Sequence, residues 1–343
     1  MSYLATTIMD EYRLPYANTQ ADQHEHRMAN YGILEGFKED TPNLVDVNMI
    51  SGNKTYQDQT TSYPVIKRTS YTISTTRSCT AIAKYRESAW VNVTFATMRS
   101  GFKMIPAEHE YNVLKYMNIF KRQMDDMQRD FNAALDALAY TTINSAISAV
   151  NNADGNPYNV VSNVMQVPAD DQELYFNEIG GVFKQNDFTN TDLKFICSPR
   201  IDPMIRHLGA QGSGNSTNLA YQFMGYDFKY SRNVAVEATD RDTIFAYAPG
   251  SLGFVTWIDP DSRLGSKTHD RIWSVEPMPL LGFDVGMLYT DGCDDNSTVA
   301  GNGMEASKYE SFIFSFDYAF ITAYNSDSTT YPGSIYKSAF NKI

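Results

Sequence analysis

The feature that most constrains this chain is a long stretch of helical periodicity, from Pro106 to Val150. Apolar residues recur in alternating steps of three and four, and no glycine or internal proline interrupts them, which predicts one face of a single helix. At about 1.5 Å per residue this helix would reach roughly 65 Å, about twice the diameter of a small domain. The polar positions between the apolar ones include Asp130 and Asp136. The residues predicted to pack along the buried stripe are Met117, Phe120, Met124, Met127, Phe131, Leu135 and Leu138.

Composition and charge narrow the class of protein. The 343 residues carry 28 Lys and Arg against 40 Asp and Glu, a formal net charge of -12, and 13% are aromatic. The aromatic content predicts an ordered protein, and the acidity disfavours a nucleic-acid groove, which needs a basic stripe to displace counterions. The N-terminus has no signal-peptide pattern and no stretch approaches the length of a membrane span, so we expect a soluble protein made in the cytoplasm and no membrane partner.

Residues 51–105 have β-strand character and are predicted to form an extended hairpin. Its two strands are expected near Tyr63–Ser74 and Ala89–Met98, where Thr, Tyr, Val and Ile dominate. Between and beside the strands, an otherwise acidic chain has a local basic excess. The residues concerned are Arg68, Arg77, Lys84 and Arg86. The hairpin is either simply solvated or is a projecting arm whose positive charges meet acidic patches on a neighbouring copy.

The rest of the chain mixes both kinds of structure. Residues 1–50 are polar and weakly patterned, which predicts an arm that needs neighbours to become ordered. A short helix is expected at 170–183 and a buried strand at 193–197, directly followed by Ser198 and Pro199 at the start of a helix. Short strands are predicted at 226–257 and 271–289. A loop at 291–303 precedes a long strand at 311–320 with alternating aromatic residues.

No segment of the sequence matches a catalytic, phosphate-binding or metal-binding motif in full. The segment Gly209–Ser216 approaches a phosphate-binding loop, but Asn215 stands where the lysine should be, and the segment follows a helix. Two neighbouring histidines, His24 and His26, do not share a helix face, and Asp291–Asn302 lacks the glycine and glutamate of a calcium loop. Cys197 lies in an apolar strand, where its thiol should be inert. We therefore predict no catalytic, cofactor or metal site and no enzyme activity.

The order of these elements resembles the major capsid protein of tailed bacteriophages, the Hong Kong 97-type fold. The local likeness is strongest at Phe195–Arg200 and at Met224–Phe228. The resemblance implies an α+β fold divided into five parts. These are an N-terminal arm at 1–50, an extended β-hairpin loop at 51–105, a spine helix of the peripheral domain at 106–160, an axial α/β domain at 161–265, and peripheral-domain strands with the C-terminus at 266–343.

The resemblance also implies a function. Subunits of this family assemble into hexamers and pentamers of an icosahedral shell in the virion, around double-stranded DNA that is contacted without sequence specificity. Expected partners are other copies of the chain, a portal and decoration proteins, with synthesis and assembly in the host bacterial cytoplasm. Because residues 1–50 lack the long charged coiled coil of an internal scaffold, either a separate scaffolding protein or a removed prodomain is also implied. A negative inner wall suits this role, because it lets DNA slide during packaging.

Two alternatives stay open at the level of sequence. An encapsulin-like compartment shares the fold and differs in what it encloses. A soluble enzyme or carbohydrate-binding protein, whose long helix spans two subdomains, would instead account for the many tyrosines and acidic loops. Such a protein requires a deep pocket with convergent polar groups.

Overall fold

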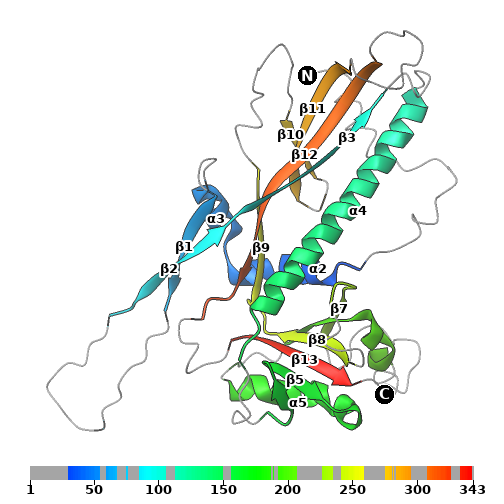
Figure 1. Ribbon diagram of the computed structural model, residues 1–343. Helices are drawn as coiled ribbons and strands as arrows, with labels where there is room; N and C mark the ends of the chain where they lie inside the picture. The colour runs from blue at the N-terminus through cyan, green and yellow to red at the C-terminus, as the bar shows by residue number, and fades with distance from the viewer. Residues whose placement is uncertain are drawn as a thin grey trace. The chain divides into compact units, whose positions relative to one another are not determined.

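The protein is a mixed helix-and-sheet fold, as the computed structural model shows (Figure 1). The structure describes residues 30–54, 59–67, 75, 85–105, 113–149, 156–186, 188, 192–206, 226–234, 241–258, 275–279, 281, 283–294, 307–325 and 333–341. They fall into two compact units. The helix–sheet unit contains Phe95–Ala134 and Thr256–Tyr318, and the α/β unit contains Asn30–Thr94, Leu135–Val255 and Ala319–Ile343.

Helix α4, Val113–Ser145, is the continuous helix that the periodicity predicted, but it ends five residues before Val150. The predicted residues 106–112 lie outside the described part of the chain. At the other end, the Thr142 hydroxyl donates to the carbonyl four residues earlier, and the Ala146 N–H bonds to the carbonyls of both Thr142 and Ile143. The Ser148 N–H then donates to the Ile335 carbonyl at 2.8 Å. Pairing with a distant segment therefore ends the helix early.

An antiparallel sheet in the order β10-β11-β12-β3 forms most of the helix–sheet unit. Its strands are β10 (Val275–Pro279), β11 (Asp284–Asp294), β12 (Ser307–Thr322) and β3 (Ala96–Met104). The long strand predicted at 311–320 is confirmed. The loop predicted to begin at Asp291 is wrong at its start, since Asp291 pairs with Glu310 and the ladder continues to Asp294.

Aromatic rings join the N-terminal part of α4 to this sheet. Phe120 meets Phe312 edge to face with ring centroids 4.8 Å apart, and it also contacts Phe102 at 5.5 Å. Further along the helix, Phe131 meets Phe316 at 5.6 Å. Edge-to-face pairs at such separations add to the energy of simple burial. The predicted packing of the helical stripe against the 311–320 strand is seen in these contacts.

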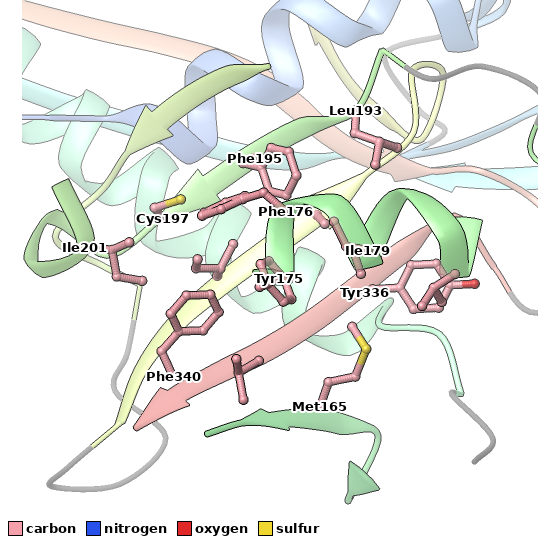
Figure 2. Close-up of a cluster of buried hydrophobic side chains, with 14 of the residues drawn as sticks. Met165, Tyr175, Phe176, Ile179, Leu193, Phe195, Cys197, Ile201, Tyr336 and Phe340 are labelled. Atoms are coloured by element: carbon pink, nitrogen blue, oxygen red, sulfur yellow. The ribbon is translucent and has the colours of Figure 1, made fainter. Parts of the chain in front are cut away.

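A six-stranded sheet in the order β4-β5-β13-β8-β6-β7 is the centre of the α/β unit. Its strands are β4 (Asn159–Val161), β5 (Val164–Val167), β13 (Ile335–Asn341), β8 (Arg241–Tyr247), β6 (Lys194–Cys197) and β7 (Asp227–Tyr230). Helix α5, Gln172–Gln185, follows a short turn of 3-10 helix, Ala169–Asp171, and lies near the predicted position. Figure 2 shows the buried cluster that α5 forms with the sheet, including Tyr175, Phe176, Phe195 and Phe340.

Strand β6 runs into the step predicted from Ser198 and Pro199. The Ser198 side chain accepts from the Arg200 N–H, and Pro199 opens a 3-10 turn, Pro199–Ile201, that leads into a helical turn through residue 206. A proline at this point costs nothing, since the first N–H groups of a helix have no partner within it. The local prediction is therefore confirmed.

The C-terminal strand β13 was not predicted from the sequence. It lies inside the six-stranded sheet, pairing with β8 on one side and parallel to β5 on the other. All but the last of its residues are buried. The predicted grouping of 266–343 into one domain is therefore wrong in its last part, because the hydrogen bonds of β13 tie the end of the chain to the α/β sheet.

The predicted arm at 1–50 is also wrong over its last third. Residues 32–44 form helix α2 (Gly32–Leu44), and residues 47–53 form helix α3 (Val47–Asn53). Helix α2 packs against β6 and β7, and Ile33, Leu34 and Phe37 are at most 1% exposed. A segment whose apolar side chains are so fully buried is part of the core. Residues 1–29 lie outside the described part of the chain.

The hairpin prediction holds in outline and fails in detail. Strands β1 (Thr60–Ile66) and β2 (Ser88–Thr94) form a two-stranded antiparallel sheet, visible as a separate ribbon in Figure 1. The single strand predicted at 89–98 is two strands, since the chain leaves β2 at Phe95 and continues as β3 in a different sheet. Phe95 is 2% exposed. A buried aromatic residue at the break thus ends the hairpin ten residues before the predicted limit of 105.

Candidate functional site

The outward face of the β1–β2 hairpin carries large apolar side chains that nothing in the described structure covers. Pro64 lies directly opposite Trp90, and Ile66 lies two residues further along the same face. Trp90 is 67% exposed and Ile66 is 58% exposed, whereas Tyr63 and Val93 on the other face are buried. Exposed tryptophan beside a second large apolar residue is typical of a binding surface.

The basic residues predicted to make inter-subunit contacts belong mostly to the part of the hairpin beyond the described strands. Arg68, Arg77 and Lys84 lie outside the described residues. Arg86 is exposed just before β2. At the end of the paired strands, the Lys67 ammonium lies 3.6 Å from the Glu87 carboxylate, and the Lys67 N–H donates to the Glu87 carbonyl. The contact role of the four basic residues stays a prediction.

The stripe predicted along α4 follows the buried face at first and then departs from it. Phe120, Met124, Met127, Phe131 and Leu135 are buried, and Met117 is half-buried. Leu138 is 39% exposed, so its predicted place in the stripe is wrong. After Leu135 the buried apolar positions of the helix are Ala139 and Ile143, each four residues on. A strict step of four turns the buried face around the helix, because 3.6 residues make one turn.

Asp136 is the most unexpected residue of α4, because it was assigned to the polar side and is fully buried. One carboxylate oxygen accepts the N–H groups of Ile33 at 3.1 Å and Leu34 at 3.0 Å. The other accepts from the Ser231 hydroxyl and from the Asn233 side-chain amide at 2.7 Å. Four donors around one buried carboxylate satisfy its acceptor sites and compensate for its loss of water.

The contact to Ile33 and Leu34 is a helix cap supplied by another element. Both N–H groups belong to the first turn of α2, where a helix has no internal acceptors, and Tyr31 at the N-cap position makes no side-chain cap bond. Asp136 takes the place of an N-cap aspartate, and its negative charge lies at the positive end of the α2 dipole. The carboxylate comes from about 100 residues further along the chain.

Asp40 does the reverse near the other end of α2, since here the helix supplies the carboxylate. Asp40 is fully buried and accepts the N–H groups of Gly250 at 2.9 Å, Ser251 at 2.8 Å and Leu252 at 2.9 Å. Next to it, the Thr41 hydroxyl accepts the Phe254 N–H at 2.8 Å. The turn before strand β9, Leu252–Trp257, is thereby bonded to the last turns of α2.

Glycines let α2 approach the sheet this closely. A Cβ at position 32 would lie 2.5 Å from the Tyr230 carbonyl oxygen, a distance that real contacts do not reach. At position 36 it would lie 3.0 Å from the Tyr247 hydroxyl. Burial, followed by the charge of Asp40, raises the pKa of that hydroxyl, so Tyr247 stays neutral beside the carboxylate. Gly32 and Gly36, spaced one turn apart, thus set the depth of the helix.

Cys197 is buried in strand β6. Burial raises the pKa of the Cys197 thiol, so the reactive thiolate is suppressed, in agreement with the inert strand cysteine predicted from the sequence. No group of three His, Cys, Asp or Glu residues in the described ranges could hold a metal ion. The near-motifs at 24–26 and 209–216 lie outside those ranges. Over the same part of the chain, no helix is long and apolar enough to cross a membrane.

One sequence signal could have identified Asp136. It is the sole charged residue between Asp130 and Asp154, in a stretch otherwise made of apolar, small and uncharged polar residues. A lone charge in such surroundings is a candidate for a buried, fully hydrogen-bonded group. Asp40 has no comparable signal, because Glu39 and other polar residues surround it in the sequence.

No protein-family model matches the chain, and no curated protein matches its sequence. Solved structures do match over nearly the whole length. A structure from Mycobacterium phage Che8 has a TM-score of 0.52 at 10% identity, covering 96% of this chain and 97% of its own. One from Mycobacterium phage Adephagia has a TM-score of 0.50 at 11% identity, covering 97% of each chain.

A third similar structure is described as the asymmetric unit of the bacteriophage PhiM1 mature capsid. It has a TM-score of 0.50 at 11% identity and covers 96% of this chain and 93% of its own. At these identities the likeness is one of fold. The resemblance to phage capsid proteins predicted from the sequence is confirmed at that level.

Proposed function

We propose that this chain is the major capsid protein of a tailed phage. In this role it is a structural subunit without catalytic activity, and it assembles into hexamers and pentamers of an icosahedral shell that encloses double-stranded DNA in the virion. The observation that carries the proposal is the match of fold to a structure from a mature phage capsid, over 96% of this chain and 93% of the other.

The parts of the fold take the roles that this family implies. Helix α4 is the spine and the helix–sheet unit is the peripheral domain, while the six-stranded sheet with α5 is the axial domain. The hairpin β1–β2 is the extended loop. Two assignments change from those made on sequence alone: the C-terminal strand β13 belongs with the axial sheet, and helices α2 and α3 are excluded from the N-terminal arm.

The hairpin supports an assembly role through its surface. Large apolar residues that lie together on an exposed face are typical of a surface that a partner covers. Trp90 and Ile66 provide such a face, and the basic residues beyond them contrast with the formal net charge of -12 of the whole chain. We assign this face to the contact with a neighbouring subunit.

A shell of this kind implies further partners besides neighbouring subunits. A wall of negative subunits binds packaged DNA weakly and without sequence preference, since like charges repel. Assembly in the host cytoplasm requires a separate scaffolding protein, and the finished shell carries a portal and decoration proteins. Each of these partners is part of the proposal.

Expression of the full chain with its scaffolding protein, followed by sucrose-gradient sedimentation and negative-stain microscopy, tests the function. The expected result is capsomers or closed shells of many copies. A protein that stays monomeric from micromolar to near-millimolar concentration, with or without the scaffold, would exclude the proposal. Shells that enclose a protein cargo and are never filled with DNA in infected cells would instead identify an encapsulin-like compartment.

A further inference from the structure

Helix α2 is attached to the α/β unit by buried carboxylates at both of its ends, which we call the two-carboxylate clamp. Asp136 holds the first turn of α2 through the N–H groups of Ile33 and Leu34. Asp40 holds the last turns through the N–H groups of residues 250–252. Both carboxylates are 0% exposed. Hydrogen bonds to a charged acceptor are among the stronger ones in proteins, and losing one in a buried place is costly.

The hydrogen bonds of the clamp constrain α2 in a way that its apolar contacts do not. Phe37 already packs edge to face on Phe320 at 5.0 Å, and Ile33 and Leu34 are buried. Apolar contacts tolerate sliding and rotation, because they have no preferred direction. Directional bonds at two ends of one helix fix both its rotation and its position along its axis. Buried polar groups of this kind can give a fold a single arrangement instead of added stability.

What α2 fixes in turn is the root of the hairpin. The chain passes from α2 through Val45 and Asp46 into α3, where the Asp46 side chain caps the helix by accepting the Asn48 N–H at 3.0 Å. Helix α3 packs against β1, the first strand of the hairpin. Lys54, at the end of α3, is 7% exposed. The path from clamp to hairpin therefore runs through short helices with few residues between them.

We propose that Asp136 and Asp40 are positioning residues for assembly: by clamping α2 they fix the root of the hairpin, and so the place from which its exposed face meets a neighbouring subunit. Neither residue lies on the hairpin. This inference rests on the proposed function, since it assigns the hairpin a contact in the shell. The clamp itself can be measured on the unassembled subunit, where no shell is involved.

The second oxygen of Asp136 allows a swap experiment. In Asp136→Asn, one orientation of the new amide keeps an acceptor for Ile33 and Leu34 but places an NH₂ group against the NH₂ of Asn233. Donor then faces donor. The double variant Asp136→Asn with Asn233→Asp exchanges the two groups and restores one donor and one acceptor at this contact. The matched control is Asp126→Asn on an exposed turn of α4, where the side chain is 72% exposed.

Amide hydrogen exchange on the soluble full chain measures how firmly the clamp holds α2, and the yield of assembled shells measures the effect on assembly. We expect Asp136→Asn to speed exchange across residues 31–54 by about tenfold or more, the cost expected when a buried donor faces a donor and one of them loses its acceptor. Shell yield should fall by a similar factor. The double variant should return both to within about threefold of wild type, and Asp126→Asn should change neither.

Several outcomes would overturn the inference. Unchanged exchange across 31–54 in Asp136→Asn would mean that no clamp operates. Faster exchange with a wild-type shell yield would mean that the clamp does not position the hairpin. If Asp136→Asn gives no soluble protein, a soluble double variant with wild-type exchange supports the proposal and an insoluble one contradicts it. If the wild-type chain itself forms no shells, the proposed function fails, and with it the positioning role, while exchange still decides whether the clamp exists.

Discussion

Helix α2 and the β1–β2 hairpin are close in the chain and differ in where their apolar side chains lie. In α2, Phe37 is fully buried and both ends of the helix are bonded to other elements of the same subunit. In the hairpin, Trp90 is 67% exposed, and within the described part of the chain only the opposite face of the ribbon is covered. The difference separates residues that the subunit needs for its own fold from residues that it leaves for a partner.

The largest effect on stability is expected for Phe37→Ala. Removing a fully buried ring that packs on Phe320 leaves a cavity, which costs about 3–5 kcal/mol. Chemical denaturation of the subunit measures the loss. Phe37→Leu is the control, and it should cost much less because most of the volume is kept. A loss below about 1 kcal/mol for the alanine variant would show that α2 is not part of the core.

The next effect contrasts two leucines of one helix. Leu135 is 0% exposed and Leu138 is 39% exposed. Leu135→Ala should lower the free energy of unfolding by about 2–5 kcal/mol, whereas Leu138→Ala should lower it by about 1 kcal/mol or less. Thermal and urea unfolding of the two variants measure the difference. Equal losses of unfolding free energy in the two variants would support the predicted place of Leu138 in the buried stripe, and would contradict the change of buried face after Leu135.

A smaller loss of stability is expected for a change at Gly32, where α2 lies against the backbone of β7. Gly32→Ala places a methyl group against the Tyr230 backbone, where the nearest atom lies 2.5 Å away, and forcing the helix outward should cost about 1–3 kcal/mol. The matched control is Gly52→Ala in α3, where a Cβ meets nothing within 4 Å. That change should be neutral or stabilise by up to about 1 kcal/mol, because alanine favours helix more than glycine does. A Gly32→Ala subunit as stable as wild type would contradict the close approach of α2 to β7.

The smallest effect on stability, and the largest on assembly, is expected for Trp90→Ser. An exposed side chain contributes little to the isolated subunit, so the free energy of unfolding should change by no more than about 0.5 kcal/mol. Shell yield should fall at least about tenfold, since a buried tryptophan anchor in an interface is worth about 2 kcal/mol or more. Asn92→Ser, on the same face of the same strand, is the control and should assemble normally. A destabilised monomer would place Trp90 within the subunit's own fold.

Some of these features could be predicted from the sequence and others could not. The long helix and the 307–322 strand could be predicted because each buries one face continuously, so periodicity records their surroundings. The step at Ser198 and Pro199 could be predicted because helix starts use local chemistry. Leu138 was misplaced because periodicity does not register a face that turns along the helix. The exposed face of the hairpin was not predicted. Apolar and polar residues alternate along β1 and β2, and this alternation does not indicate which face a neighbouring subunit covers.

Helix α2 could not be predicted because its start is capped from elsewhere. Its N-cap residue, Tyr31, lacks a capping side chain, and the acceptor is Asp136, on another helix. Gly32, Gly36 and Pro42 read as breaks when helix propensity alone is considered. In the fold, the two glycines allow close packing, and the proline lies in the last turn. Long-range hydrogen bonds and backbone approach have no local sequence pattern.

A cryo-electron-microscopy reconstruction of assembled particles would show what covers the outward face of the hairpin. We expect a closed shell in which Trp90 and Ile66 of each subunit are buried against a neighbouring copy. Trp90 would then fall from 67% exposed in the subunit to buried in the shell. A shell in which this face stays in solvent, with subunits joined by other surfaces alone, would show that the hairpin face is not an assembly contact.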